Sequence, residues 1–208
     1  MRKRLLEWLA CPLCRKKLKL EIFLQEEKEI VEGTLQCLCG QQFPIISGVP
    51  RMLHGTLKKN LVQVYPNFFL RYRDQLDETF VSEEDVMIRH KQKTIDRFGY
   101  EWTHFNDYDC DNFNAFIKPL PKNFLKGKLG LDIGCGAARH AGQASKQGAE
   151  VVCVDLSEAV DMAYKNNIGN ELVHVVQSDV YNLPFNTGNF QFIYSLGVLH
   201  HLPEPERG

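Results

Sequence analysis

LDIGCGAARH, residues 131–140, is an apolar run that ends in two glycines and leads into a segment suited to a helix. Gly134 and Gly136 have no side chains, so a ligand can approach the backbone N–H groups at the start of that helix. A dinucleotide-binding loop needs a third glycine three positions after the second, and Arg139 stands there. The loop therefore predicts a ligand held at a helix N-terminus and disfavours NAD.

The segments that follow alternate between strand-like and helix-like patterns. We expect strands at residues 128–133, 150–155, 172–177 and 190–196, and helices from the loop to about 147 and at 157–167. Strands that alternate with helices form βαβ units and a parallel sheet. The fold class is therefore α/β and Rossmann-like.

Polar side chains stand at the ends of these strands. Asp155 ends the second strand, Ser178 and Asp179 follow the third, and Ser195 lies near the end of the fourth. Ligands of doubly wound folds bind at the carboxyl ends of the strands, so these residues are expected around one pocket. A carboxylate at the position of Asp155 can accept both hydroxyls of a ribose. The alternative is a doubly wound domain that has acidic strand ends by chance.

These features resemble the class I S-adenosylmethionine-dependent methyltransferases, of the methyltransferase type 11-like kind. The first motif of that family is an acidic residue followed by Gly-x-Gly-x-Gly. Asp132, Gly134 and Gly136 match it, and Ala138 stands where the third glycine usually is. The resemblance implies S-adenosyl-L-methionine as cofactor and the strand order 3-2-1-4.

The resemblance also implies a role for each strand end. Asp155 is expected to bind the ribose, and Asp179 to accept the adenine amino group. The Val180 N–H would face the purine ring, and Ser178 would border that pocket. Backbone carbonyls near Ser195 would hold the amino group of the methionine moiety.

Two histidines, His200 and His201, follow the fourth strand close to where the transferred methyl group should point. One of them can act as a base if the acceptor must lose a proton. The alternative is structural, because His-His-Leu-Pro is common scaffolding in this family's fourth motif.

A different chemistry dominates the N-terminal quarter of the chain. Cys11, Cys14, Cys37 and Cys39 form two close pairs, separated by strand-like runs. Four thiolates in a tetrahedral array are the usual closed, structural zinc site. Such a site has no open position for substrate, so its expected role is to stabilise a unit with a small core.

Residues 1–54 resemble the Trm112-like zinc-ribbon domain. The resemblance rests on the early C-P-x-C and on the segment from Cys39 to Leu53, which follows the pattern C-G-x-x-F-P-I-x-x-G-V-P-R-M-L. The single residue Leu38 between the second pair departs from the more usual spacing of two residues.

We therefore expect three regions: a zinc ribbon at 1–54, a helical and aromatic-rich connector at 55–126, and the N-terminal half of the cofactor domain at 127–208. A helix is expected at 81–98 in the connector. The aromatic cluster at 98–105, with Trp102, either packs against the core or forms a lid over the cofactor.

Composition limits the remaining possibilities. The formal net charge is −1, which gives no strong attraction to nucleic acid, and the basic run at 15–19 is expected to be a solvated face. No apolar run reaches the ~20 residues of a membrane span. Seven cysteines without a secretory signal favour the cytoplasm.

The sequence stops after the fourth strand of a sheet that continues through three more strands in this family. We expect a fragment or truncated chain whose fourth strand would be an exposed edge, which a partner chain can cover.

Three functions remain in competition. The first is methyl transfer to a small-molecule, glycan-like or lipid-like acceptor. The second is an RNA or protein methyltransferase that uses the ribbon for docking. The third is a truncated, non-catalytic chain that binds cofactor or a partner.

Overall fold

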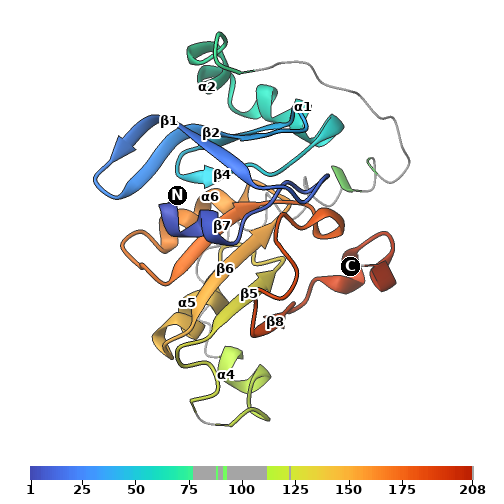
Figure 1. Ribbon diagram of the computed structural model, residues 1–208. Helices are drawn as coiled ribbons and strands as arrows, with labels where there is room; N and C mark the ends of the chain where they lie inside the picture. The colour runs from blue at the N-terminus through green and yellow to red at the C-terminus, as the bar shows by residue number, and fades with distance from the viewer. Residues whose placement is uncertain (77–87, 89–90, 93–111, 122, 208) are drawn as a thin grey trace.

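The computed structural model describes residues 1–76, 88, 91–92, 112–121 and 123–207. This part of the chain contains two four-stranded sheets (Figure 1). The C-terminal sheet is parallel and consists of β5 (Leu129–Ile133), β6 (Glu150–Asp155), β7 (Val173–Gln177) and β8 (Phe192–Tyr194), in the order β7-β6-β5-β8. The helices between its first three strands are α5 (Arg139–Lys146) and α6 (Ala159–Asn166). The expected 3-2-1-4 order and the Rossmann-like fold class are confirmed.

Side chains of the parallel sheet alternate between two apolar layers. Val151 and Cys153 of β6 pack in a cluster with the alanines of α5 and α6. Val152 and Val154 pack in a second cluster with side chains of the N-terminal region, among them Phe43. Because successive strand residues point to opposite faces, both helices cover one face and the N-terminal region covers the other.

The N-terminal sheet is antiparallel and follows a short 3-10 helix, η1 (Lys3–Glu7). Its strands, in spatial order, are β1 (Leu18–Glu26), β2 (Glu29–Cys37), β3 (Gln42–Ile46) and β4 (Val49–Pro50). Ser47 and Gly48 join β3 to β4 with φ of 51° and 80°, as a type I′ hairpin turn requires. A β-carbon at Gly48 would lie 2.4 Å from the Tyr164 ring of α6, so this turn also permits close contact between the domains.

The chain continues from β4 along the edge of β7 and joins the two sheets. Arg51 and Gln177 form a parallel bridge, and the Met52 N–H donates to the Gln177 carbonyl at 2.8 Å. The Arg51 side chain is fully buried, pairs with Asp161 of α6 and donates to the Gln177 side chain at 3.2 Å. Its guanidinium also lies 4.7 Å from the centre of the Tyr65 ring. The N-terminal region is therefore integral to the core of the molecule.

The remaining described helices are α1 (Gly55–Val64), α2 (Pro66–Arg71) and α4 (Asn112–Phe116). Most of the helix expected at 81–98 and the whole aromatic cluster at 98–105 lie outside the described residues. None of the described helices is long and apolar enough to cross a membrane.

Two expectations need correction. The fourth strand is shorter than expected and ends at Tyr194, because Ser195 turns inward and Gly197 adopts a φ of 75°, which bends the chain away. Arg15 is not simply solvated, because its guanidinium donates to the backbone carbonyls of Leu183 and Phe185.

Candidate functional site

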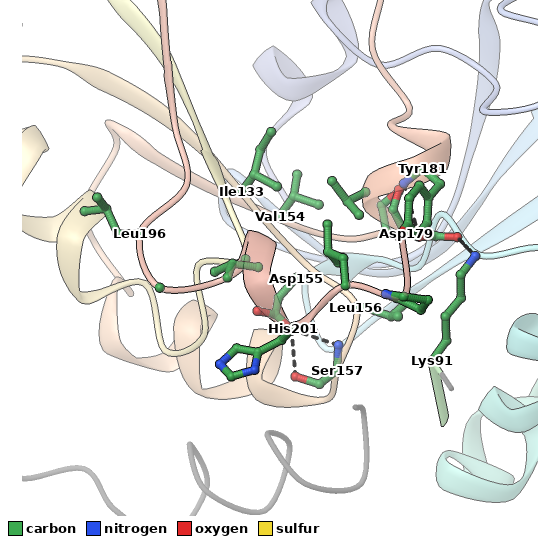
Figure 2. A pocket seen from close by; sticks show the side chains of 17 residues that line it. Lys91, Ile133, Val154, Asp155, Leu156, Ser157, Asp179, Tyr181, Leu196 and His201 are labelled. Atoms are coloured by element: carbon green, nitrogen blue, oxygen red, sulfur yellow. Dashed lines mark hydrogen bonds and ion pairs between the residues drawn. The ribbon is translucent and has the colours of Figure 1, made fainter. Parts of the chain in front are cut away.

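A cavity lies at the carboxyl ends of the parallel strands (Figure 2). Its walls come from the loops after all four strands and from one residue of the connector. The lining residues are Lys91, Ile133, Gly134, Val154, Asp155, Leu156, Ser157, Ser178, Asp179, Val180, Tyr181, Leu196, Gly197, Val198, His201, Leu202 and Pro203. Six of the expected site residues therefore meet here: Gly134, Asp155, Ser178, Asp179, Val180 and His201.

The glycine loop is fastened to the neighbouring strand. The N–H groups of Gly134 and Cys135 both donate to the Val154 carbonyl, at 2.7 and 3.0 Å. Gly134 has a φ of 73°, and a β-carbon there would lie 2.4 Å from the Val198 side chain. Glycine is required at this position both by the backbone conformation and by the close approach of the loop after β8.

Asp155 connects the loops after β5 and β6. Its Oδ2 accepts the Gly136 N–H at 2.9 Å, and its Oδ1 accepts the backbone N–H and hydroxyl of Ser157 at 2.9 and 2.7 Å. A carboxylate has about four acceptor positions, so one remains on Oδ2 without rearrangement. Gly136 thus contributes by holding this carboxylate and does not itself line the cavity.

Asp179 is held just as firmly at the end of β7. Its Oδ1 accepts the Tyr181 N–H at 3.2 Å, while its Oδ2 accepts the Asn182 side-chain amide at 3.4 Å and contacts Lys91 Nζ at 2.5 Å. The Ser178 hydroxyl donates to backbone carbonyls in the same turn. The two carboxylates of Asp155 and Asp179 thus mark two separate parts of one cavity wall (Figure 2).

Asp132 lies beneath the glycine loop, outside the cavity lining. It is 1% exposed, and its Oδ2 has no hydrogen-bond partner among the described residues. Burial, with a further contribution from the charge of Asp155, raises the pKa of Asp132 to about 7, and the Tyr194 hydroxyl opposes this rise. An ionised carboxylate without a full set of partners is costly in a buried position, so the protonated form of Asp132 is favoured in the folded chain.

The segment after β8 places its polar residues differently from the expectation. The Ser195 hydroxyl donates to the Ile133 carbonyl at 3.0 Å, and the cavity is lined by the next three residues instead. His200 and His201 lie on the 3-10 helix η3 (Leu199–His201), with ring centres 3.9 Å apart. Only His201 of this pair lines the cavity.

The four cysteines form a second site, at one end of the N-terminal sheet. The sulfurs of Cys11, Cys14, Cys37 and Cys39 all lie within 4.8 Å of one another. Tetrahedral zinc with Zn–S bonds of about 2.3 Å needs sulfurs about 3.8 Å apart, so the arrangement fits. The Lys16 N–H lowers the pKa of Cys14, whereas burial raises the pKa values of Cys11 and Cys37, so the support for a metal site comes from the placement of the four sulfurs. The single-residue spacing at Cys37 and Cys39 does not prevent both from joining the cluster.

Sequence reasoning missed Lys91, Ser157 and Arg51. Ser157 had a local signal, because it follows Asp155 by two residues at the start of a helix, where a hydroxyl commonly caps. Lys91 and Arg51 had none, because their partners Asp179 and Asp161 are 88 and 110 residues away along the chain.

The C-terminal half is thus a Rossmann-like parallel sheet with a cavity at the carboxyl ends of its strands, and a cysteine-rich region packs on the opposite face of this sheet from its helices. Comparison with known families agrees. Residues 131–208 match the family described as "Methyltransferase domain", and residues 2–48 match the family "Trm112p-like protein". Residues 2–48 are therefore similar to a Trm112p-like domain, and residues 131–208 are similar to a methyltransferase domain.

Two curated relatives are similar to part of the chain. A ubiquinone biosynthesis O-methyltransferase of Coxiella burnetii is 33% identical over 85 residues, which are 40% of this chain and 36% of that protein. A tRNA U34 carboxymethyltransferase of Pseudoalteromonas translucida is 34% identical over 109 residues, covering 50% of this chain and 31% of that protein. The chain thus spans about a third of the length of these two relatives.

A solved structure of phosphoethanolamine N-methyltransferase 2 of Haemonchus contortus, in complex with S-adenosyl-L-methionine, is also similar. It is 27% identical, with a TM-score of 0.40, over 47% of this chain and 24% of that one.

Proposed function

We propose that this chain is an S-adenosylmethionine-dependent methyltransferase that binds its cofactor in the cavity at the ends of β5 to β8. The observation that carries the proposal is the convergence of Gly134, Asp155 and Asp179 on one cavity within the matched segment 131–208. When bound, the cofactor supplies an electrophilic methyl group on a sulfonium. The chain then has to hold an acceptor nucleophile close and in line and to exclude water.

Each part of the cavity wall is assigned one part of the cofactor. The free acceptor position on Asp155 takes a ribose hydroxyl, and Asp179 takes the adenine amino group. Val180 and Ser178 border the purine, since both line the cavity next to Asp179. The methionine end is assigned to the loop around Gly134.

Asp132 and Ser195 belong to the same proposed end of the site. We assign Asp132, which is buried beside its register neighbour Tyr194, and Ser195 to support of the glycine loop, since the bond from Ser195 to the Ile133 carbonyl fixes the start of that loop. Neither side chain lines the cavity, so both act through the loop that carries them.

His201 is the better candidate for a base, should the acceptor lose a proton. It lines the cavity and is exposed, so an acceptor can reach its imidazole, whereas His200 is not among the lining residues. A positioned base is worth ~10²–10⁴ in rate.

The four-cysteine cluster is proposed to hold a structural zinc ion. All four ligand positions would be filled by protein, so the metal contributes folding free energy rather than catalysis. The domain that it stabilises covers one face of the parallel sheet, with Phe43 and Met52 in the shared core. We accordingly propose zinc-ribbon, connector and cofactor regions with boundaries near 54 and 126.

For the acceptor we favour a small or lipid-like molecule. The near-neutral charge of −1 gives no electrostatic footprint for nucleic acid, and one relative is named for ubiquinone biosynthesis. RNA is the second candidate, because other relatives are named as tRNA methyltransferases and tRNA carboxymethyltransferases.

The acceptor proposal is tested with cofactor labelled in its methyl group, offered together with a catechol-type quinol precursor, a lipid extract or total tRNA. We expect label in the quinol or lipid fraction, and Asp155→Ala as a control should remove it. Label in tRNA, lost at high salt, would favour the second candidate. Cofactor binding without transfer to any fraction would favour a non-catalytic chain.

A further inference from the structure

Lys91 brings a cation from the connector into the wall of the cavity. Its side chain is 11% exposed and reaches the carboxylate of Asp179, which is 4% exposed, with 2.5 Å between Nζ and Oδ2. The ammonium also lies 4.9 Å from the centre of the Tyr181 ring. Figure 2 shows the side chain extended towards Asp179. A pair this deeply buried is sensitive to the loss of either partner.

The backbone that carries Lys91 is attached to the rest of the molecule. The side-chain oxygen of the next residue, Gln92, accepts a hydrogen bond from Asn60 Nδ2 of α1 at 2.6 Å. The position of Lys91 is therefore fixed through α1, which packs on the N-terminal domain. Its partner Asp179 is fixed by the Tyr181 N–H and the Asn182 amide.

The bonds of Asp179 are divided between its two oxygens. Oδ2 is occupied by Lys91 and by the Asn182 amide, whereas Oδ1 accepts the Tyr181 N–H alone. Each carboxylate oxygen has two acceptor positions, so the free position is on Oδ1. Lys91 thereby fixes which oxygen of Asp179 is available to a ligand.

We infer that Lys91 is a positioning residue for an amino-substituted purine: it holds Asp179 so that Oδ1 accepts the exocyclic 6-amino group. This inference rests on the proposed function, because it needs an adenine in this part of the cavity. Displacement of Lys91 by adenine is disfavoured, because a charge-assisted hydrogen bond would be exchanged for a weaker one inside a buried site.

The test is a double-mutant cycle between the lysine and the amino group. The ligands are S-adenosylhomocysteine and its 6-deaminated purine analogue, titrated into the zinc-loaded full chain. The proteins are the wild type, Lys91→Met, Lys91→Arg, Asp179→Asn and the double variant. A loss of fold would weaken both ligands equally, so the ratio of the two affinities reports positioning alone.

The wild type is expected to bind S-adenosylhomocysteine about tenfold or more tightly than the 6-deaminated analogue. This ratio corresponds to the free energy of one hydrogen bond to a charged group. Lys91→Met should reduce this preference by at least about threefold, and Lys91→Arg should retain it. Asp179→Asn should reduce the preference, and adding Lys91→Met should then change it no further. Lys118→Met, at an exposed residue after α4, is the matched control and should leave both affinities unchanged.

An unchanged preference in Lys91→Met would overturn the inference while leaving the proposed function standing. Tighter binding of S-adenosylhomocysteine by that variant would also overturn it, because Lys91 would then block the adenine site. If the wild type binds neither ligand, the proposed function fails as well.

Discussion

Replacing Asp132 by asparagine should remove a loss of folding stability that the unliganded protein undergoes as the pH rises. The carboxyl group is 1% exposed on the helix-covered side of β5, where Tyr194 of β8 and Cys153 of β6 are its neighbours in register. Burial is the main reason that its pKa rises to about 7 in the folded chain. In the unfolded chain the value is about 3.9.

The direction of the change in stability with pH follows from the number of protons bound in each state. Between these two pKa values the folded state keeps a proton that the unfolded state has lost, so the contribution of Asp132 to stability decreases as the pH rises. Three pKa units correspond to about 4 kcal/mol over the whole window. Between pH 5 and pH 8 the change amounts to about 2–3 kcal/mol.

The assay is urea unfolding of wild type and Asp132→Asn, both zinc-loaded, at several pH values from 5 to 8. Taking the difference between the two proteins cancels every other titrating group that they share. The variant should gain about 2–3 kcal/mol relative to wild type across this range, with most of the gain below pH 7. A difference that stays constant with pH, or that favours wild type as the pH rises, would refute the burial argument.

Three further substitutions test other parts of the structure. Arg51→Ala should cost more than about 1 kcal/mol in urea unfolding, because it removes a buried guanidinium that pairs with Asp161 and donates to Gln177, whereas the exposed Arg71→Ala should cost less than about 1 kcal/mol. Equal costs would contradict the assigned role of the domain junction. Cys14→Ser should lower the zinc content, measured by native mass spectrometry, below the one ion per chain expected of wild type, and a metal-free wild type would contradict the zinc site. For an acceptor that must lose a proton, His201→Gln should lower the rate of methyl transfer at saturating cofactor by ~10², and an equal loss in the His200→Gln control would argue against a base at His201.

Local patterns made much of the cofactor domain predictable. The strands at β6 and β7 begin and end within one residue of the expected positions, because buried parallel strands are short apolar runs that end in polar residues. The close pairs of Cys11 and Cys14 and of Cys37 and Cys39 likewise indicated the cluster of four sulfurs, since each pair stands on its own tight turn.

Contacts between distant segments were not predictable. Nothing in the spacing of β4 indicates that the following residues pair with the edge of β7, and a buried arginine such as Arg51 is indistinguishable in sequence from a surface one. The same holds for Lys91, which lies in a stretch of charged residues that is typical of an exposed helix. Site residues whose partners are distant in the sequence, such as Lys91 and Asp179, can be assigned only once the fold is known.

Calorimetric titration of the zinc-loaded chain with S-adenosylhomocysteine tests the central claim most directly, with Asp155→Ala as the matched variant. One site per chain is expected, with binding weakened at least about tenfold in the variant because its carboxylate both receives the ribose and holds the Gly136 N–H. A folded wild-type chain that gives no heat and no thermal shift at millimolar ligand would contradict the assignment of this cavity to the cofactor.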